Sequence, residues 1–192
     1  MALHSSDVNA GDDILATHNN NLIDDIQDHT HDGTDTAKVD FTANPETRYY
    51  GIYPPDFVCE PYNNCFLDDN GTHLRTISDT DPLTGYASVH LPHGATITSF
   101  KVYWYRDDAA ATGAAYFNRC SISGITGVAN AEAHSNATTG YHSVEDTTIT
   151  FPIVDSQLYK YYILSTLDPN NSHDDVRFVG AVITYTIVEP LP

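Results

Sequence analysis

The chain has 192 residues, enough for one body of ordinary domain size and an appendage, since a body of about 150 residues buries roughly 70% of its unfolded surface. Its 26 acidic residues against eight Lys and Arg give a formal net charge of −18, and such a field repels nucleic-acid phosphate and anionic membranes. No apolar run of about 18 residues occurs, and residues 1–13 lack the basic and apolar regions of a secretory signal. We therefore expect no nucleic-acid partner, no membrane insertion and no ordinary signal-directed secretion.

Residues 1–11 show no periodic pattern and end in Asn-Ala-Gly, so we interpret them as a flexible attachment arm. Residues 12–36 form a predicted helical stem. Asp12 and Asp13 offer an N-cap and negative charge where a helix would begin. We expect this helix over residues 13–27, because the Gly of the following His-Asp-Gly segment ends helical structure.

An apolar seam runs along the predicted helix. Leu15, Asn19, Leu22, Ile26 and His29 are separated by four, three, four and three residues, which is the spacing of a short coiled coil. A helix of about four turns is marginal alone in water because helix nucleation is costly. We therefore expect it to pack on copies of itself, with Asn19 as a buried polar residue that fixes the register.

The seam ends in a His-Thr-His segment that suits a metal. If three chains associate, His29 and His31 of each chain supply six imidazole nitrogens around one axis, an octahedral set that favours iron over nickel or zinc. The alternative is an exposed His-rich turn without metal. A barrel-type metal hydrolase is disfavoured because no strands and helices alternate. Residues 68–71 and 79–81 have oxygens for Ca²⁺, but neither segment reproduces an EF-hand loop, so solvated turns are the simpler interpretation.

The three cysteines leave two interpretations open. Cys59 and Cys65 bracket a short loop, so a disulfide between them is geometrically allowed. Scattered thiols in a chain without a secretory signal are more often reduced. Cys120 has no obvious partner.

From residue 37 onward, the helical period gives way to alternating β-branched and aromatic residues. We interpret residues 37–85 as a loop-rich connecting β region that begins with a candidate strand at 37–43. Pro54 and Pro55 prevent continuous strand pairing, and a short apolar piece spans 73–77.

Residues 86–192 form the predicted head of the protein. Strands are expected at 86–91, 96–107, 113–125, 126–134, 146–154, 157–167 and 175–188, with Gly-, Asn-, Asp- and Pro-rich breaks between them. Seven or eight short strands with no helix between them indicate a mainly β fold, an antiparallel β-sandwich or jelly roll.

Two of the expected strands indicate where they are buried. In the strand at 96–107, one face carries Phe100, Val102 and Trp104, and the other carries Lys101, Tyr103 and Tyr105. Both faces of the strand at 175–188 are apolar, so we place it centrally in a sheet or at an oligomer contact.

Tyrosines are the candidate binding residues of the head. Tyr103, Tyr105, Tyr159 and Tyr161 lie in clustered aromatic segments and are predicted to form a surface for sugar or protein, because Tyr adds contact area at low entropic cost. The alternative is that they pack on the faces of sheets. No nucleophile elbow, P-loop, zinc-protease motif or dinucleotide-binding glycine pattern occurs, so we expect a protein that is not an enzyme.

Two segments resemble parts of known virion proteins. The segment GDDILATHNNNLIDDIQDHTHDGTDTAKV, residues 11–39, resembles the N-terminal stem of tail-fibre and related virion proteins of tailed prokaryotic viruses. Its His-Thr-His pair is similar to the His-x-His metal sites on the three-fold axes of phage fibres and spikes. The segments LPHGATITSFKVYWYRDDA, YKYYILSTL and DVRFVGAVITYTI resemble a β-sandwich module of tail-fibre-type proteins.

This resemblance implies a homotrimeric virion protein on the tail or capsid surface. The arm would bind other virion proteins, and three heads would attach to a glycan or protein of the host surface through avidity. Two alternatives remain: a capsid or collar decoration protein that binds no receptor, and a secreted adhesin or lectin-like module. A polysaccharide-cleaving enzyme is the least favoured interpretation.

Overall fold

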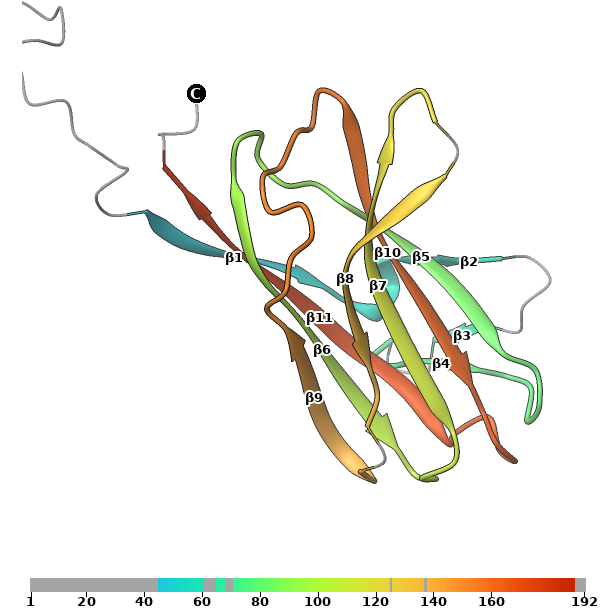
Figure 1. Cartoon of the computed structure of the whole chain (residues 1–192). Coiled ribbons are helices and arrows are strands. Elements are labelled where there is room, and N and C mark those ends of the chain that lie inside the picture. Colours follow the sequence, from blue (N-terminus) through green and yellow to red (C-terminus); the bar gives the residue numbers. More distant parts are fainter. Residues whose placement is uncertain (1–44, 61–64, 68–70, 125, 137, 189–192) are drawn as a thin grey trace, which may run out of the picture. The chain divides into compact units, whose positions relative to one another are not determined.

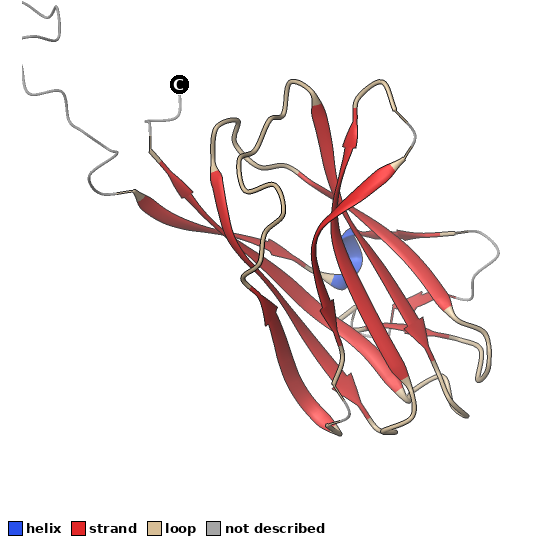
Figure 2. Ribbon diagram, viewed as in Figure 1, coloured by secondary structure: helices blue, strands red, loops and turns tan. Residues whose placement is uncertain are grey.

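The computed structural model describes residues 45–60, 65–67, 71–124, 126–136 and 138–188, without the side chains of residues 65 and 66. In these ranges, the chain forms eleven strands and one short 3₁₀ helix. The strands build two antiparallel sheets that face each other (Figures 1 and 2). The predicted mainly β fold, an antiparallel β-sandwich, is confirmed.

The first sheet, here called the β11 sheet, has the order β3 (Cys65–Leu67), β4 (Leu74–Thr76), β11 (Val176–Ile187), β6 (Thr96–Arg106) and β9 (Gly140–Asp146). A further strand, β1 (Glu46–Ile52), pairs with β11 on the same edge as β4. The second sheet, called the β10 sheet, has the order β2 (Phe57–Cys59), β5 (Leu83–Val89), β10 (Tyr159–Asp168), β7 (Thr112–Ser121) and β8 (Gly127–His134). The predicted central position of the last strand is confirmed, because β11 has partners on both edges.

The chain crosses between the sheets where the sequence predicts breaks. Pro54 and Pro55 begin the 3₁₀ helix η1 (Pro54–Asp56), which carries the chain from β1 in one sheet to β2 in the other. The Asp56 carboxylate accepts a hydrogen bond of 2.8 Å from the backbone N–H of Tyr53 and fixes this corner. Residues 91–95 make a second crossing from β5 to β6, with Gly94 at a φ of 80° that favours glycine.

The residues predicted to connect the stem to the head belong to the sandwich itself. Of the segment 37–85, the part from 46 to 76 supplies β1 to β4, and β5 already begins at Leu83, before the expected head boundary at 86. The physical reason is the length of β11, which has 12 residues. Its second edge would expose unpaired backbone groups without β1 and β4.

One strand was placed wrongly along the chain. In the segment 146–154, predicted as a strand, Asp146 is the last residue of β9 (Gly140–Asp146), the strand that pairs with β6, and the rest makes only an isolated bridge between Ile153 and Thr96. β9 is an edge strand whose residues alternate only between half-buried and exposed. Its sequence therefore carries no apolar alternation for sequence reasoning to detect.

The backbone of the segment after β9 is satisfied by groups outside any strand ladder. The N–H of Thr150 donates to the carbonyl oxygen of Asn130, and the N–H of Val154 donates to that of Ala95. Pro152 has no N–H to donate, which interrupts any regular ladder. These contacts fix the segment against the start of β6 and the middle of β8.

The core lies between the two sheets and has Trp104 at its centre. Trp104 is fully buried and packs edge-on against Phe178, with ring centroids 5.6 Å apart. Phe100 of β6 faces Phe117 of β7 across the sandwich at 6.0 Å. The predicted division of the 96–107 strand is confirmed, since Phe100, Val102 and Trp104 are buried and Tyr103 is exposed. A Cβ at Gly113 would lie 2.8 Å from the Trp104 ring, so this position requires glycine.

Arg106, at the end of β6, is a buried cation whose partners are backbone carbonyls. Its side chain is 2% exposed, and burial lowers the pKa of its guanidinium. The guanidinium donates to the carbonyl oxygens of Asp108, Ala109, Ala111, Ser135 and Asn136. One side chain therefore holds the β6–β7 and β8–β9 connections together.

Several predictions lie outside the described residues. They are the attachment arm, the helical stem with Leu15, Asn19, Leu22 and Ile26, the strand at 37–43, and the metal ligands His29 and His31. Cys59 is disulfide-bonded, so the reduced alternative is wrong for this residue, and Cys120 is free and buried. The side chain of Cys65, the candidate partner of Cys59, lies outside the described residues. Among the described residues, no helix has the length and apolar character needed to span a bilayer.

Candidate functional site

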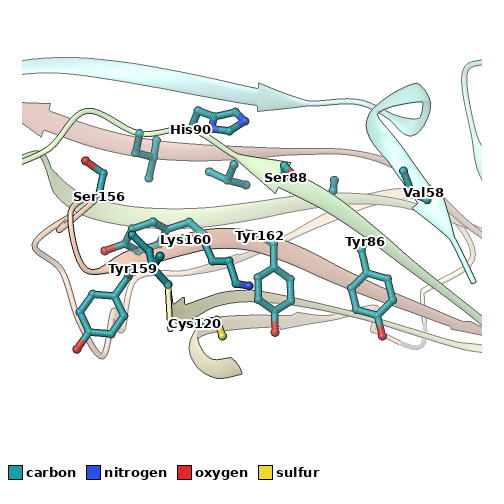
Figure 3. Close-up of a pocket in the computed structure, with 14 residues that line it drawn as sticks. Val58, Tyr86, Ser88, His90, Cys120, Ser156, Tyr159, Lys160 and Tyr162 are labelled. Atoms are coloured by element: carbon teal, nitrogen blue, oxygen red, sulfur yellow. The ribbon is translucent and has the colours of Figure 1, made fainter. Parts of the chain in front are cut away.

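A groove of about 610 Å³ lies on the outer face of the β10 sheet. It runs over β5 and β10 and is bordered by β2, the end of β7 and the loop before β10 (Figure 3). The side chains that form it include Val58, Tyr86, Ser88, His90, Ile122, Ser156, Lys160 and Tyr162. The strands supply most of these residues, so a rigid scaffold holds them.

The alternation of two paired strands puts these side chains on one face. In β5, Leu83, Ala87 and Val89 are buried, and Tyr86 and Ser88 point outward. In β10 the buried residues are Tyr161, Ile163, Ser165 and Leu167, which leaves Lys160 and Tyr162 on the outer face. The register places Tyr162 opposite Ser88 and Leu164 opposite Tyr86. Tyr86 and Tyr162 are therefore diagonal neighbours on the sheet surface.

The two tyrosine rings form the centre of the groove. Their centroids are 6.3 Å apart with an interplanar angle of 46°, and Tyr86 is 38% exposed (Figure 3). The Tyr86 hydroxyl donates a 3.0 Å hydrogen bond to the Glu60 carboxylate, and this bond raises the pKa of Tyr86. Burial raises the pKa of the Tyr162 phenol. A hydrogen bond on Tyr86 and partial burial of Tyr162 thus hold the rings in place before any ligand binds.

Gly127, at the start of β8, makes room for Tyr162. A Cβ built on this glycine would overlap the Tyr162 hydroxyl and lie 3.0 Å from its Cζ atom. Any larger residue at 127 would therefore displace the ring. The shape of the groove depends on this small residue on β8, which β7 separates from β10 in the sheet.

The polar groups of the groove are hydroxyls, an imidazole, an amine and the Cys120 thiol. No Asp or Glu is among the described residues that line it. A pair of carboxylates on either side of a bond, as glycoside hydrolysis requires, is therefore missing there. The groove offers aromatic faces and hydrogen-bonding groups, the features of a ligand-binding cleft.

Tyr103 and Tyr105, two of the predicted binding residues, lie on the opposite side of the sandwich. They project from β6 on the outer face of the β11 sheet, and Tyr103 is 40% exposed. The Tyr105 ring packs 4.8 Å from that of Tyr141 and beneath the guanidinium of Arg177. Its hydroxyl donates a 2.6 Å hydrogen bond to Asp107, which raises the pKa of Tyr105. The structure does not bring this pair together with the β10 tyrosines.

Of the other predicted pair, Tyr161 is a core residue. It is 5% exposed, its ring stacks on Phe117 at 5.9 Å, and its hydroxyl accepts a hydrogen bond from the N–H of Asp155. Tyr161 is therefore not an exposed surface residue, because it shares the inward phase of β10 with Ile163, although it also lines the groove.

Tyr159 is half-buried at the border of the groove. Its ring and that of Phe151 enclose the guanidinium of Arg119, whose carbon lies 4.3 Å and 3.3 Å from the two centroids. Its aromatic face is therefore already used by an intramolecular contact.

Sequence reasoning missed Tyr86 and Tyr162. A signal existed for Tyr162, because Lys160 in the same phase of the strand marks the solvent side. For Tyr86 the strand phase also points outward, since Leu83, Ala87 and Val89 occupy the other phase. Their proximity, however, depends on the β5–β10 pairing, which the sequence does not reveal.

A second groove of about 680 Å³ lies between β8 and β9, at the open edges of the two sheets. Its lining includes Glu132, Glu145 and Asp146 and no Phe, Tyr or Trp. No group of three or more His, Cys, Asp or Glu in the described part of the chain is arranged to hold a metal ion. In the segment 79–81, considered above for Ca²⁺, the Asp79 carboxylate accepts hydrogen bonds from His173.

No protein-family model and no curated protein sequence matches the chain. Among solved structures, it is similar to a family two carbohydrate esterase from Cellvibrio japonicus, with 10% identity over 77% of this chain but only 36% of that one, and a TM-score of 0.38. It is also similar to the C-terminal CBM6 of a laminarinase from Zobellia galactanivorans (13% identity, 71% and 99% of the two chains, TM-score 0.43). A xylan-binding domain from CBM 22 gives 9% identity over 74% and 96% of the two chains, with a TM-score of 0.46. Similarity this weak carries no conclusion about ligand or activity.

Proposed function

We propose that the sandwich is a non-catalytic carbohydrate-binding module that holds a glycan chain along the groove of Tyr86 and Tyr162. The observation that carries the proposal is the pair of partly exposed aromatic rings, set side by side on a rigid sheet and flanked by hydroxyl, imidazole and amine groups. A sugar ring has an apolar face of C–H groups and an edge of hydroxyls. The apolar face stacks on an aromatic ring, and the edge bonds to nearby polar groups.

The dimensions and rigidity of the groove agree with this function. Its volume of about 610 Å³ falls inside the usual range of roughly 300 to 1,000 Å³ for ligand clefts. Tyr loses little conformational entropy on binding, since only two torsions have to be fixed. The ordered rings reduce that cost further, because Tyr86 is already bonded to Glu60.

The test compares two tyrosines of nearly equal exposure on opposite faces. Tyr86→Ala removes half of the aromatic pair, and Tyr103→Ala removes a ring that is 40% exposed on the β11 sheet. Native gels with embedded neutral and acidic polysaccharides identify a bound polymer, and calorimetry with its oligosaccharides gives the affinity. We expect Tyr86→Ala to weaken binding at least tenfold, about 1.4 kcal/mol, and Tyr103→Ala to leave it unchanged.

Two results would reject the glycan-binding groove. One is the absence of binding to every polysaccharide tested, and the other is an equal effect of the two alanine variants. Release of reducing sugars from a bound polymer would instead indicate an enzyme.

We further propose that residues 12–36 gather three such modules on a virion, as the resemblance of residues 11–39 to tail-fibre stems suggests. Three weak glycan contacts on one stem then give durable attachment through avidity. In this proposal, Leu15, Asn19, Leu22 and Ile26 form the seam, and His29 and His31 bind an axial iron, or nickel or zinc. The residues 1–11 bind another virion protein.

The stem proposal has its own measurements. Light scattering of the full chain should give three times the chain mass of 21.1 kDa, and a monomer would reject the seam. Elemental analysis should find metal in the wild type and none in the His29→Ala, His31→Ala double variant. Equal metal content in both proteins would reject the axial site.

A further inference from the structure

We infer that the groove selects acidic glycans, those with carboxylate or sulfate groups, through Lys160. This inference rests on the proposed function and adds the chemical class of the ligand. The charge of the groove differs from that of the chain: the chain has 26 acidic residues against eight Lys and Arg, yet the described lining of the groove contains a Lys and no acid.

Lys160 differs from the other described cations because its charge has no partner. Arg48, Arg75, Lys101 and Arg177 form ion pairs with carboxylates. The guanidinium of Arg106 is bonded to backbone carbonyls, and that of Arg119 lies between two aromatic rings. In the described part of the chain, no ion pair, hydrogen bond or ring contact engages the Lys160 amine.

The position of Lys160 suits a charged substituent on a stacked sugar. It lies two residues before Tyr162 on β10, so both side chains project from the same face of the strand. Figure 3 shows the Lys160 amine beside the Tyr162 ring and within the groove. A sugar that stacks on Tyr162 therefore presents its ring substituents to an ammonium group that is not already neutralised.

The charges also give the groove a direction. Glu60 is bonded to Tyr86 at one end. Val89, the last residue of β5, pairs with Tyr161, the residue after Lys160. Lys160 therefore lies at the other end of the groove, where His90 follows β5. An acidic group is repelled near Tyr86 and attracted near Lys160, so the negative substituent should lie at the Lys160 end.

The net charge of −18 does not overrule this local preference. At physiological ionic strength, charges farther apart than about 8 Å are largely screened. A ligand in the groove therefore experiences mainly Lys160 and its immediate neighbours, while the distant carboxylates act weakly.

The test uses the full chain and matched pairs of ligands that differ only in charge. The pairs are oligogalacturonate with its carboxyl-reduced form, sulfated with desulfated agar-type oligosaccharide, and sialyllactose with lactose. The variant is Lys160→Gln. The control is Lys101→Gln, which removes a Lys that pairs with Glu145 on the opposite face.

We expect the acidic member of at least one pair to bind at least tenfold more tightly than its neutral partner. Lys160→Gln should reduce that preference below threefold, because it weakens the acidic ligand more than the neutral one, and Lys101→Gln should retain it. The pair that shows the preference identifies carboxylate or sulfate as the recognised group.

Two results overturn the inference while the glycan-binding groove stands. One is equal affinity for both members of every pair, and the other is an acidic preference that survives Lys160→Gln. In both cases, Tyr86→Ala still weakens glycan binding. If Tyr86→Ala has no effect on any bound ligand, the proposed function fails, and the inference fails with it.

Discussion

Substitution of Gly127 by Ala tests whether the groove depends on the exact placement of Tyr162. The added Cβ would overlap the Tyr162 hydroxyl and lie 3.0 Å from Cζ, where ordinary van der Waals contact begins at 3.4 Å. The backbone of β8 is held by its pairing with β7, so the tyrosine side chain is the part that moves. The ring then loses its alignment with Tyr86.

The cost should fall on binding more than on stability. Overpacking of a closed core costs about 1–3 kcal/mol, but Tyr162 is only half-buried and its free end can shift toward solvent. We therefore expect the free energy of unfolding to fall by no more than about 1 kcal/mol. Displacement of one of two stacking rings should weaken glycan binding by about fivefold to tenfold, or roughly 1 to 1.4 kcal/mol.

A double-mutant cycle measured by calorimetry attributes the effect to the hydroxyl. Tyr162→Phe removes the overlapping atom, so Gly127→Ala should weaken binding less in the Phe background, by no more than half of its cost in the wild type. The control is Gly51→Ala on β1, where the nearest atom to an added Cβ is the Tyr53 hydroxyl at 3.1 Å. This control should not change glycan affinity.

Two outcomes contradict the reasoning. Gly127→Ala could bind the glycan with wild-type affinity, which would separate the ring position from the function. Its cost could also be identical in the Tyr and Phe backgrounds, which would show that the steric contact with the hydroxyl is not the cause.

Two further predictions concern stability. Arg106→Met leaves the carbonyl oxygens that Arg106 bonds without this donor. Because hydrogen bonds to charged groups contribute roughly 1.5–3 kcal/mol each, the free energy of unfolding measured in urea should fall by about 3 kcal/mol. The exposed control Arg48→Met should cost less than about 1 kcal/mol, and an equally small loss in Arg106→Met would refute the prediction. Hydrogen bonds from the Ala110 N–H and the Asn170 amide lower the pKa of Asp108 in the folded protein. The ionised Asp108 carboxylate therefore stabilises the fold above the unfolded pKa, and this stabilisation is lost as the pH falls through the lower folded pKa. Melting temperatures should thus fall below about pH 4, and less steeply in Asp108→Asn; parallel curves would contradict this assignment.

The architecture was largely predictable because local patterns encode it. Alternation along 96–107 separates the buried Trp104 from the exposed Tyr103, and β-branched and aromatic runs mark most other strands. Pro54 and Pro55 stop a strand because proline lacks the N–H that a ladder needs, and the structure crosses between sheets at that point. Each of these signals arises from a residue and its near neighbours in the sequence.

The candidate site was not predictable to the same degree, because it depends on strand phase and on pairing between distant segments. The phase of β10 sends Tyr161 into the core and Tyr162 to the surface, and a shift of one residue reverses them. The pairing of β5 with β10 then brings Tyr86 to Tyr162 across a separation of 76 residues (162 minus 86).

Composition and short-range periodicity are enough to specify a strand-rich sandwich, the segments that form most of its strands and the acid-rich charge. The neighbours of each strand follow only from the folded arrangement, as does the pairing of β9 rather than residues 147–154 with the edge of β6. The same holds for Lys160, which lies beside the Tyr162 ring with no acid among the described residues that line the groove. Sheet pairing joins residues that are far apart in the sequence through backbone hydrogen bonds. Because every residue except proline can form both of these bonds, side-chain patterns specify strand partners only weakly.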